Sequence, residues 1–242
     1  MTDYSEDYLL DKRIKMFQPQ DGYRASSDAV LLAAAAHRIS AQDKILDVGS
    51  GTGAISLCIA ERFKHLSPQI TGIELQSELA NLANLSAHAN GFKNLNYINA
   101  DIFNSGLDFC SFNHVFSNPP YFTPNMPTSP LKGKATAHTF TSSNIEDWIT
   151  LCIKMLCPHG YFYMINRAEA LKDIIKVTEN RLGEICIFPV YSKKEQNAKR
   201  IIIRARKDSK APLQIMPPLQ IHDDNGEYTA KAQEILRKGL AI

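Results

Sequence analysis

The chain has 242 residues, 44% of them hydrophobic, and its formal net charge of +2 is close to neutral. This length and apolar content suffice for one substantial buried core. No apolar run is long enough to cross a bilayer, and the acidic start, Met1–Asp7, lacks the apolar segment of a secretory signal. We therefore expect a cytoplasmic protein that does not contact a membrane.

Cysteine usage points to a reducing compartment. The chain has five cysteines, an odd number without paired spacing, and no Cys-x-x-Cys motif. Cys152 and Cys157 fall in an apparent amphipathic helix, which favours buried thiols over metal ligands. We expect no metal site.

Strands and helices are predicted to alternate from residue 28 to residue 183. The first helix is expected over Asp28–Arg38, with Asp28 as its cap, and an apolar strand begins at Lys44. The later helices are expected near 53–64, 77–90, 144–157 and 167–183, and the later strands at Gln69–Glu74, Leu95–Asp101, His114–Ser117 and Tyr161–Ile165. Two further strands, 185–191 and 200–206, form a hairpin signal that predicts an antiparallel edge on a mostly parallel sheet.

This pattern predicts a single α/β domain. We divide it into an N-terminal arm (1–27), a core (28–207) and a C-terminal extension (208–242). Trp148 lies at helical spacing with Leu151 and Met155, which predicts a role in core packing.

A glycine-rich loop follows the strand that begins at Lys44. Gly49, Gly51 and Gly53 let the backbone turn sharply and approach a ligand, and the helix start that follows favours an anionic ligand group. The nicotinamide fingerprint requires Gly-x-Gly-x-x-Gly, whereas this loop is Gly-x-Gly-x-Gly. Asp47 precedes the first glycine and is suited to an ammonium group, so the pattern favours S-adenosylmethionine, whose methionine end carries both charges.

Three more polar side chains follow strand ends. Glu74 is suited to both hydroxyls of a ribose, and Asp101 to the exocyclic amine of an adenine. Asn118 opens the tetrapeptide Asn118-Pro119-Pro120-Tyr121. Its side-chain oxygen and the carbonyl of Pro119 form two adjacent acceptors for the hydrogens of an NH2 group, and Tyr121 provides a face for stacking. Carboxyl ends of parallel strands share one crevice, which favours one joint site.

These motifs resemble those of class I S-adenosylmethionine-dependent methyltransferases, in particular the amino-methylating group with an Asn-Pro-Pro-Tyr motif. Segments Gln20–Ala33, Asn118–Phe122, Ala198–Lys207 and the tail from Tyr228 to Arg237 resemble the bacterial tRNA1(Val) adenine-N6 methyltransferases. The resemblance spans roughly residues 16 to 239. It implies a Rossmann-like, doubly wound, seven-stranded sheet with an antiparallel C-terminal strand. It also implies that Tyr23, Arg24 and Asp28 close over the methionine end of the cofactor and that Ile102 joins Asp101.

Two segments are candidates for substrate contact. The proline-rich stretch Phe122–Lys134 follows the tetrapeptide and carries Lys132 and Lys134, although it is also consistent with a surface insertion. Lys193–Lys210 has eight basic and two acidic residues, a footprint typical of phosphate contacts or of a protected edge strand. Lys199 and Arg200 are predicted to bind RNA there, at the edge of the sheet opposite the glycine loop.

Three functions are consistent with these residues. The first is methylation of adenine N6 in tRNA, with Asn118, Pro119, Pro120 and Tyr121 as the catalytic motif and Phe122 beside it. The second is methylation of a protein glutamine at N5, because a carboxamide presents the same two hydrogens. The roughly 40 residues before the first strand are too few for the helical domain typical of glutamine enzymes. The third is a non-catalytic nucleic-acid binding module, which the intact motifs disfavour.

Overall fold

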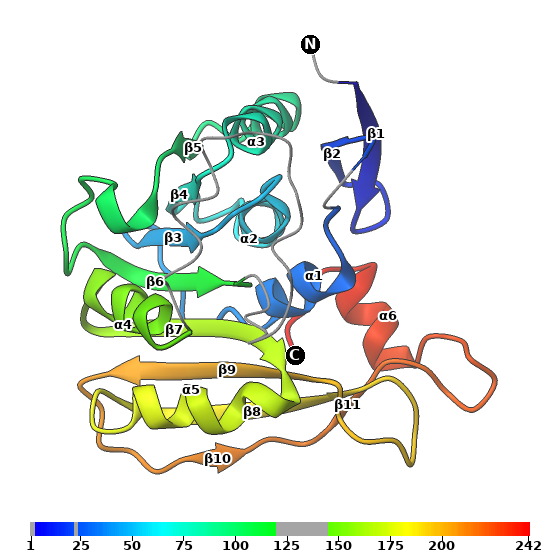
Figure 1. The fold of residues 1–242 in the computed structure, drawn as a ribbon. Helices are drawn as coiled ribbons and strands as arrows, with labels where there is room; N and C mark the ends of the chain where they lie inside the picture. The colour runs from blue at the N-terminus through cyan, green and yellow to red at the C-terminus, as the bar shows by residue number, and fades with distance from the viewer. Residues whose placement is uncertain (1–2, 22–23, 120–144) are drawn as a thin grey trace.

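The computed structural model describes residues 3–21, 24–119 and 145–242 (Figure 1). Its centre is a mostly parallel sheet in the strand order β10-β8-β9-β7-β6-β3-β4-β5, with β11 also on β8. The strands of its core are β3 (Lys44–Val48), β4 (Gln69–Glu74), β5 (Leu95–Asn99), β6 (Phe112–Ser117), β7 (Leu156–Arg167), β8 (Leu182–Tyr191) and β9 (Arg200–Lys207). These seven strands confirm the predicted sheet, and within the described residues β10 (Gln214–Ile215) and β11 (Leu219–Gln220) extend it.

The predicted hairpin of β8 and β9 is also confirmed, but its position differs from the prediction. β9 is antiparallel to both β8 and β7, so it lies within the sheet and not at its edge. Arg200 pairs in register with Arg167, the last residue of β7. β7 is parallel to β6, and β6 is parallel to β3. Arg200 therefore lies at the side of the sheet where the carboxyl ends of these parallel strands lie, and we call this side the edge that bears the site. The prediction that Lys199 and Arg200 lie opposite the glycine loop is therefore wrong.

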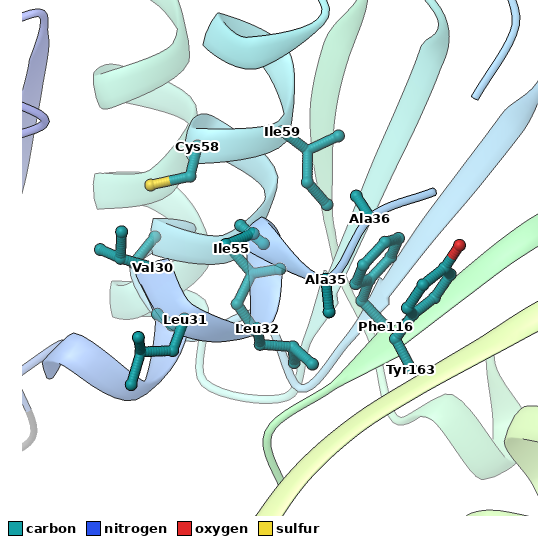
Figure 2. Close-up of a cluster of buried hydrophobic side chains, with 14 of the residues drawn as sticks. Val30, Leu31, Leu32, Ala35, Ala36, Ile55, Cys58, Ile59, Phe116 and Tyr163 are labelled. Atoms are coloured by element: carbon teal, nitrogen blue, oxygen red, sulfur yellow. The ribbon is translucent and has the colours of Figure 1, made fainter. Parts of the chain in front are cut away.

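Helices cover both faces of the sheet (Figure 1). One face carries α1 (Ser27–Ala34), α2 (Ala54–Arg62) and α3 (Ser77–Ala89), and the other carries α4 (Ile145–Met155) and α5 (Leu171–Thr178). Each face of the sheet carries a hydrophobic core: the first lies under α1, α2 and α3, and the second under α4 and α5. Figure 2 shows the first core, where Leu32 of α1 and Ile55 of α2 pack on the side of the sheet that bears Phe116 and Tyr163. Phe116 and Tyr163 stack with ring centroids 4.1 Å apart. Packing in the first core therefore fixes the positions of α1 and α2 relative to the ends of the strands.

Several element boundaries differ from the predictions. Ser26, and not Asp28, caps α1, because the Ser26 hydroxyl accepts a hydrogen bond from the Asp28 N–H. β5 ends at Asn99, two residues early, because Asp101 caps the short 3-10 helix η1 (Ile102–Asn104). The expected helix 167–183 is a 3-10 turn, η2 (Ala168–Ala170), followed by α5.

The N-terminal arm is a hairpin of β1 (Tyr4–Leu9) and β2 (Ile14–Pro19), and the chain closes with α6 (Ala230–Leu236) beside α1 (Figure 1). In the described parts of the chain, no helix is long and apolar enough to cross a membrane.

Candidate functional site

The ends of the parallel strands bring the predicted site residues to one edge of the sheet. Val48 at the end of β3 pairs with Ser117 at the end of β6, and also with Ile73 of β4. The glycine loop after β3, Glu74 and Asn118 therefore meet at the same edge, as the doubly wound arrangement requires. Tyr23, Pro120, Tyr121, Phe122, Lys132 and Lys134 lie outside the described residues.

The glycine loop adopts the backbone that its sequence predicts. Gly49, Gly51 and Gly53 have φ of 71°, 56° and 87°, a region that L-residues with side chains rarely occupy. Space is also restricted at two of them. A Cβ on Gly53 would lie 2.2 Å from the Tyr97 hydroxyl, and one on Gly49 would lie 3.1 Å from the Trp148 ring. The loop can therefore accept no side chain at Gly53 and approaches the Trp148 ring closely at Gly49.

Glu74 is fixed by backbone donors from both sides. One carboxylate oxygen accepts the Gly51 N–H at 2.9 Å, and the other accepts the Gln76 N–H at 2.9 Å. The side chain is buried, so these bonds hold it in one orientation against the loop. Each oxygen keeps a further lone pair that can accept a bond from a ligand hydroxyl.

Asp47 lies fully buried beneath the loop. Its Oδ2 accepts bonds from the Ser56 hydroxyl at 2.7 Å and the Ser56 N–H at 3.2 Å. Burial raises the pKa of Asp47 to about 7, with a smaller upward contribution from the Glu74 carboxylate, although the Ser56 bonds act in the opposite direction. Within the described structure, its Oδ1 and the Ser50 hydroxyl are buried without a hydrogen-bond partner.

These two unsatisfied atoms fit a polar ligand at the loop. A buried polar atom without a partner is costly, and a bound group that donates hydrogen bonds removes that cost. A carboxylate and a hydroxyl beside a glycine cradle suit the ammonium and carboxylate of an amino acid moiety. The residues present therefore fit the methionine end of S-adenosylmethionine.

Asp101 and Ile102 occupy the turn after β5. Asp101 is partly buried, and its carboxylate accepts the Phe103 N–H at 3.0 Å and the Asn104 amide at 3.4 Å. Ile102 is buried in the second core. The turn holds Asp101 near the end of β5, two strands from the glycine loop.

Asn118 and Pro119 continue β6 at the edge of the site. Asn118 is half-buried and Pro119 is buried. The preceding Ser117 donates its hydroxyl to the Val48 carbonyl at 2.9 Å and accepts the indole N–H of Trp148 at 2.9 Å. Trp148 thereby joins the end of β6 to the glycine loop, in addition to the core packing that its spacing predicts and its burial confirms.

Arg24 and Asp28 have partners at the entrance to α1. Arg24 bonds Asp7 through Nη2, and its Nη1 donates to the Ser5 hydroxyl at 2.9 Å. Asp28 forms an ion pair with Arg200, with Nε and Oδ2 2.9 Å apart. Arg200 therefore connects β9 to the first turn of α1.

The basic segment Lys193–Lys210 is divided between the two ends of β9. At the end remote from the glycine loop, Lys207 donates to the carbonyls of Ile153 and Leu156, and Arg206 contacts Glu184 and the Tyr161 ring. Lys193, Lys194 and Lys199 are exposed and lie around the loop that ends at Arg200. We call these three residues the lysine rim.

Four contributors to this site were not predicted from the sequence: Ser50, Ser56, Tyr97 and the indole N–H of Trp148. Ser56 and Tyr97 bond each other at 3.0 Å under Asp47. They come from α2 and β5, and only the fold brings them together, so no local pattern could have identified them. In the described residues, no group of three or more His, Cys, Asp or Glu side chains is placed to hold a metal ion.

Comparison with known proteins identifies the family. A family model described as a methyltransferase domain matches residues 39–208. The tRNA1(Val) (adenine(37)-N6)-methyltransferase of Glaesserella parasuis is 30% identical over 210 residues, which cover 86% of each chain. The protein of the same name from Porphyromonas gingivalis is 29% identical over 74% of each chain.

A solved structure supports the same assignment. The predicted O-methyltransferase Atu636 from Agrobacterium tumefaciens has a TM-score of 0.73 and 25% identity, and the match covers 89% of this chain and 98% of that one. The predicted fold class is thereby confirmed. The chain belongs to the methyltransferase domain family, the S-adenosylmethionine-dependent enzymes that its motifs predict.

Proposed function

We propose that the chain transfers a methyl group from S-adenosylmethionine to N6 of an adenine in tRNA, and that this adenine is position 37 of tRNA1(Val). The observation that carries the proposal is the junction of Asn118 with the glycine loop through Ser117 and Val48. This junction sets an amine-binding motif beside a donor-binding loop. The names of the relatives support the tRNA substrate.

The donor is held by residues of four strand ends. The Oδ1 of Asp47 is available for the ammonium, and Glu74 for the ribose hydroxyls. Asp101 and Ile102 are proposed to contact the adenine of the donor. The methionine end of the donor is proposed to contact Tyr23, Arg24 and Asp28. When bound, the donor supplies a sulfonium methyl that a lone pair can attack directly.

Asn118 and Pro119 prepare the acceptor. The N6 lone pair of adenine is delocalised into the ring, so its attack is weak. Two acceptors, the Asn118 side-chain oxygen and the Pro119 carbonyl, would accept hydrogen bonds from the two N6 hydrogens and direct the lone pair toward the donor. One N6 proton would leave after the methyl group is transferred. Positioning then supplies a large part of the rate. Pro120 is proposed to keep the motif rigid, and Tyr121 with Phe122 would stack on an unpaired base turned out of its loop.

The lysine rim is proposed to contact the RNA backbone. It lies at the edge of the sheet that bears Asn118, so an RNA that presents a base to Asn118 can reach it. Lys132 and Lys134 are proposed to add to this contact. Arg200 is proposed to contribute through its ion pair with Asp28, which orders the adjacent backbone of Lys199.

Incubation of the protein with labelled donor and a transcript of tRNA1(Val) tests the proposal. We expect label in N6-methyladenosine, none with a transcript that carries guanine at position 37, and a loss of turnover of about 100-fold or more for Asn118→Ala. Asn225→Ala, on an exposed turn, is the matched control. Label in protein glutamine would replace the proposal by the second function, and label in 2′-O-methyl nucleosides would move the acceptor to oxygen.

A binding measurement tests the role of Asp47. An ammonium beside Asp47 favours its charged form, so donor binding at about pH 6.5 should release protons. Calorimetry in buffers of different ionisation enthalpy measures this release. We expect it in the wild type and not in Asp47→Asn. Equal proton release in both proteins would show that the ammonium does not contact Asp47.

A further inference from the structure

The N-terminal hairpin is anchored to the donor-binding half of the sheet. In β2, the Phe17 N–H donates to the Ser86 hydroxyl at 2.9 Å, and Lys15 exchanges two hydrogen bonds with the Asn90 amide. Both partners belong to α3 or its end. Met16 is buried, and its sulfur lies 3.9 Å from the Thr52 hydroxyl in the glycine loop. The hairpin therefore covers the glycine loop from the side of α2 and α3.

Two side chains of the hairpin hold the segment that leads into α1. Gln18 is 3% exposed; its amide oxygen accepts the Ala25 N–H at 2.7 Å, and its amide nitrogen donates to Asp7 at 2.9 Å. The same Asp7 oxygen is paired with Arg24. Residues 24 and 25 are thus tied to β1 and β2 by a network centred on Asp7 and Gln18.

The segment held in this way borders the site. Ser26 caps α1 one residue after Ala25, and Asp28 in the first turn pairs with Arg200 at the edge where the parallel strands end. α1 also packs on α2, which begins at the last glycine of the loop (Figure 2). The start of α1 therefore lies at the same end of the sheet as the glycine loop, and we call it the wall of the site.

We infer that the hairpin clamps this wall, and that Gln18 and Asp7 are positioning residues for the methyl donor. They touch no reacting atom. They fix Arg24 and Ala25, and through them the start of α1 against the glycine loop. The inference rests on the proposed function only insofar as the donor binds at that loop.

The variant Gln18→Ala tests the clamp. It leaves the Ala25 N–H without its partner and frees Asp7 from one donor, so we expect donor affinity to fall by about tenfold. We expect the KM for the donor to rise by a similar factor while kcat stays within about twofold, because the chemistry at Asn118 is not altered. Hydrogen exchange of the Ala25 amide should accelerate even without donor, which is a readout that does not depend on activity.

Asp7→Asn is the second variant, and Glu6→Gln is the matched control. Asp7→Asn removes the charge that holds Arg24 and keeps the size of the side chain, so it should weaken donor binding with little effect on folding. Glu6 pairs with Lys15 at 3.0 Å on the same hairpin but does not contact Arg24 or Ala25, so Glu6→Gln should bind the donor as the wild type does.

The outcomes separate the clamp from the proposed function. If folded Gln18→Ala and Asp7→Asn bind the donor as tightly as the wild type, the clamp is wrong and the proposed function stands. A second outcome also overturns the inference. If all three variants, Glu6→Gln included, lose donor affinity in proportion to the fall in their melting temperatures, the network only stabilises the hairpin. If the wild type binds no donor, the donor assignment itself fails.

Discussion

At the scale of single residues, the site is built on buried polar groups that the apoprotein holds at a cost. Asp47 is the clearest case, because it is fully buried and only one of its oxygens has a partner in the described structure. A buried carboxyl group of this kind makes the stability of the protein depend on pH, and a single substitution can reveal that dependence.

Asp47→Asn should change how stability varies with pH. Burial raises the folded pKa from 3.8 to about 7, so the folded state holds a proton that the unfolded state releases between these values. The contribution of Asp47 to stability is therefore fully present below about pH 4, falls as the pH rises, and levels off above about pH 7. Urea unfolding between these values should show wild-type stability falling relative to Asp47→Asn, by an amount on the order of a few kcal/mol. Parallel curves for the two proteins would show that Asp47 is not protonated in the folded state.

Trp148→Phe should separate a positioning role from core packing. The change keeps an aromatic ring in the core but removes the outer indole atoms beside Gly49 and the N–H that holds Ser117, the residue before Asn118. We expect a loss of about 1 kcal/mol in stability and of about tenfold in turnover. Tyr163→Phe removes hydroxyl bonds to His37 and His114 that lie away from the site, so it should lower stability to a similar degree without the loss of turnover. Equal turnover in both variants would restrict Trp148 to packing.

At the scale of elements, β9 shows how one basic segment acquires different tasks along its length. Arg206 and Lys207 at its far end make internal contacts, and Arg200 at its near end pairs with Asp28. The net charge of the segment therefore overstates the charge available to a partner. The lysine rim is the exposed part of it at the edge that bears the site.

Replacing the lysine rim by glutamine should weaken RNA binding without affecting the donor. Each lost phosphate contact removes counterion release, so the slope of log affinity against log salt should become shallower by about 0.7 to 0.9 per contact. Lys210→Gln, in the same basic segment but at the far end of β9, is the control and should keep the wild-type slope. A salt titration of tRNA binding measures this. If the triple variant also keeps the wild-type slope, the phosphates are bound elsewhere.

At the scale of the whole molecule, the C-terminal extension contacts both α1 and the turn of the N-terminal hairpin. The Ile242 N–H donates to the Ala34 carbonyl at 3.2 Å, and Arg13 donates to the Arg237 carbonyl at 3.2 Å. Ile235 of α6 is fully buried in the same core as α1 and α2. The C-terminal extension therefore supports the helix whose start borders the site.

Ile235→Ala should destabilise the protein by about 2 to 5 kcal/mol, because it leaves a cavity in the core shared with α1. Leu240→Ala, also in the tail but 48% exposed, should change stability by less than about 0.5 kcal/mol. Urea unfolding of both variants measures the difference. A small effect of Ile235→Ala would mean that the tail can separate from the core without loss.

The sequence by itself determined those features that local patterns encode. Alternating apolar strands and helices specified the doubly wound sheet, and the glycine spacing specified a loop with positive φ, because only glycine adopts that backbone at no cost. The strand-end positions of Asp47, Glu74 and Asn118 followed from the same pattern. The division into arm, core and extension, and the roles of the residues outside the described parts, stay predictions.

Only the tertiary structure decided which groups meet across the chain. β1 is polar and half-exposed, so no periodicity marks it, and it is ordered by pairing with β2, which is anchored to α3. The place of β9 between β7 and β8 moved Lys199 and Arg200 to the edge that bears the site, because strand order depends on long-range pairing and not on the residues of the strand. The partners of Asp47, Ser117 and Gln18 come from distant segments for the same physical reason: a buried polar atom takes whichever donor the packed fold brings within reach.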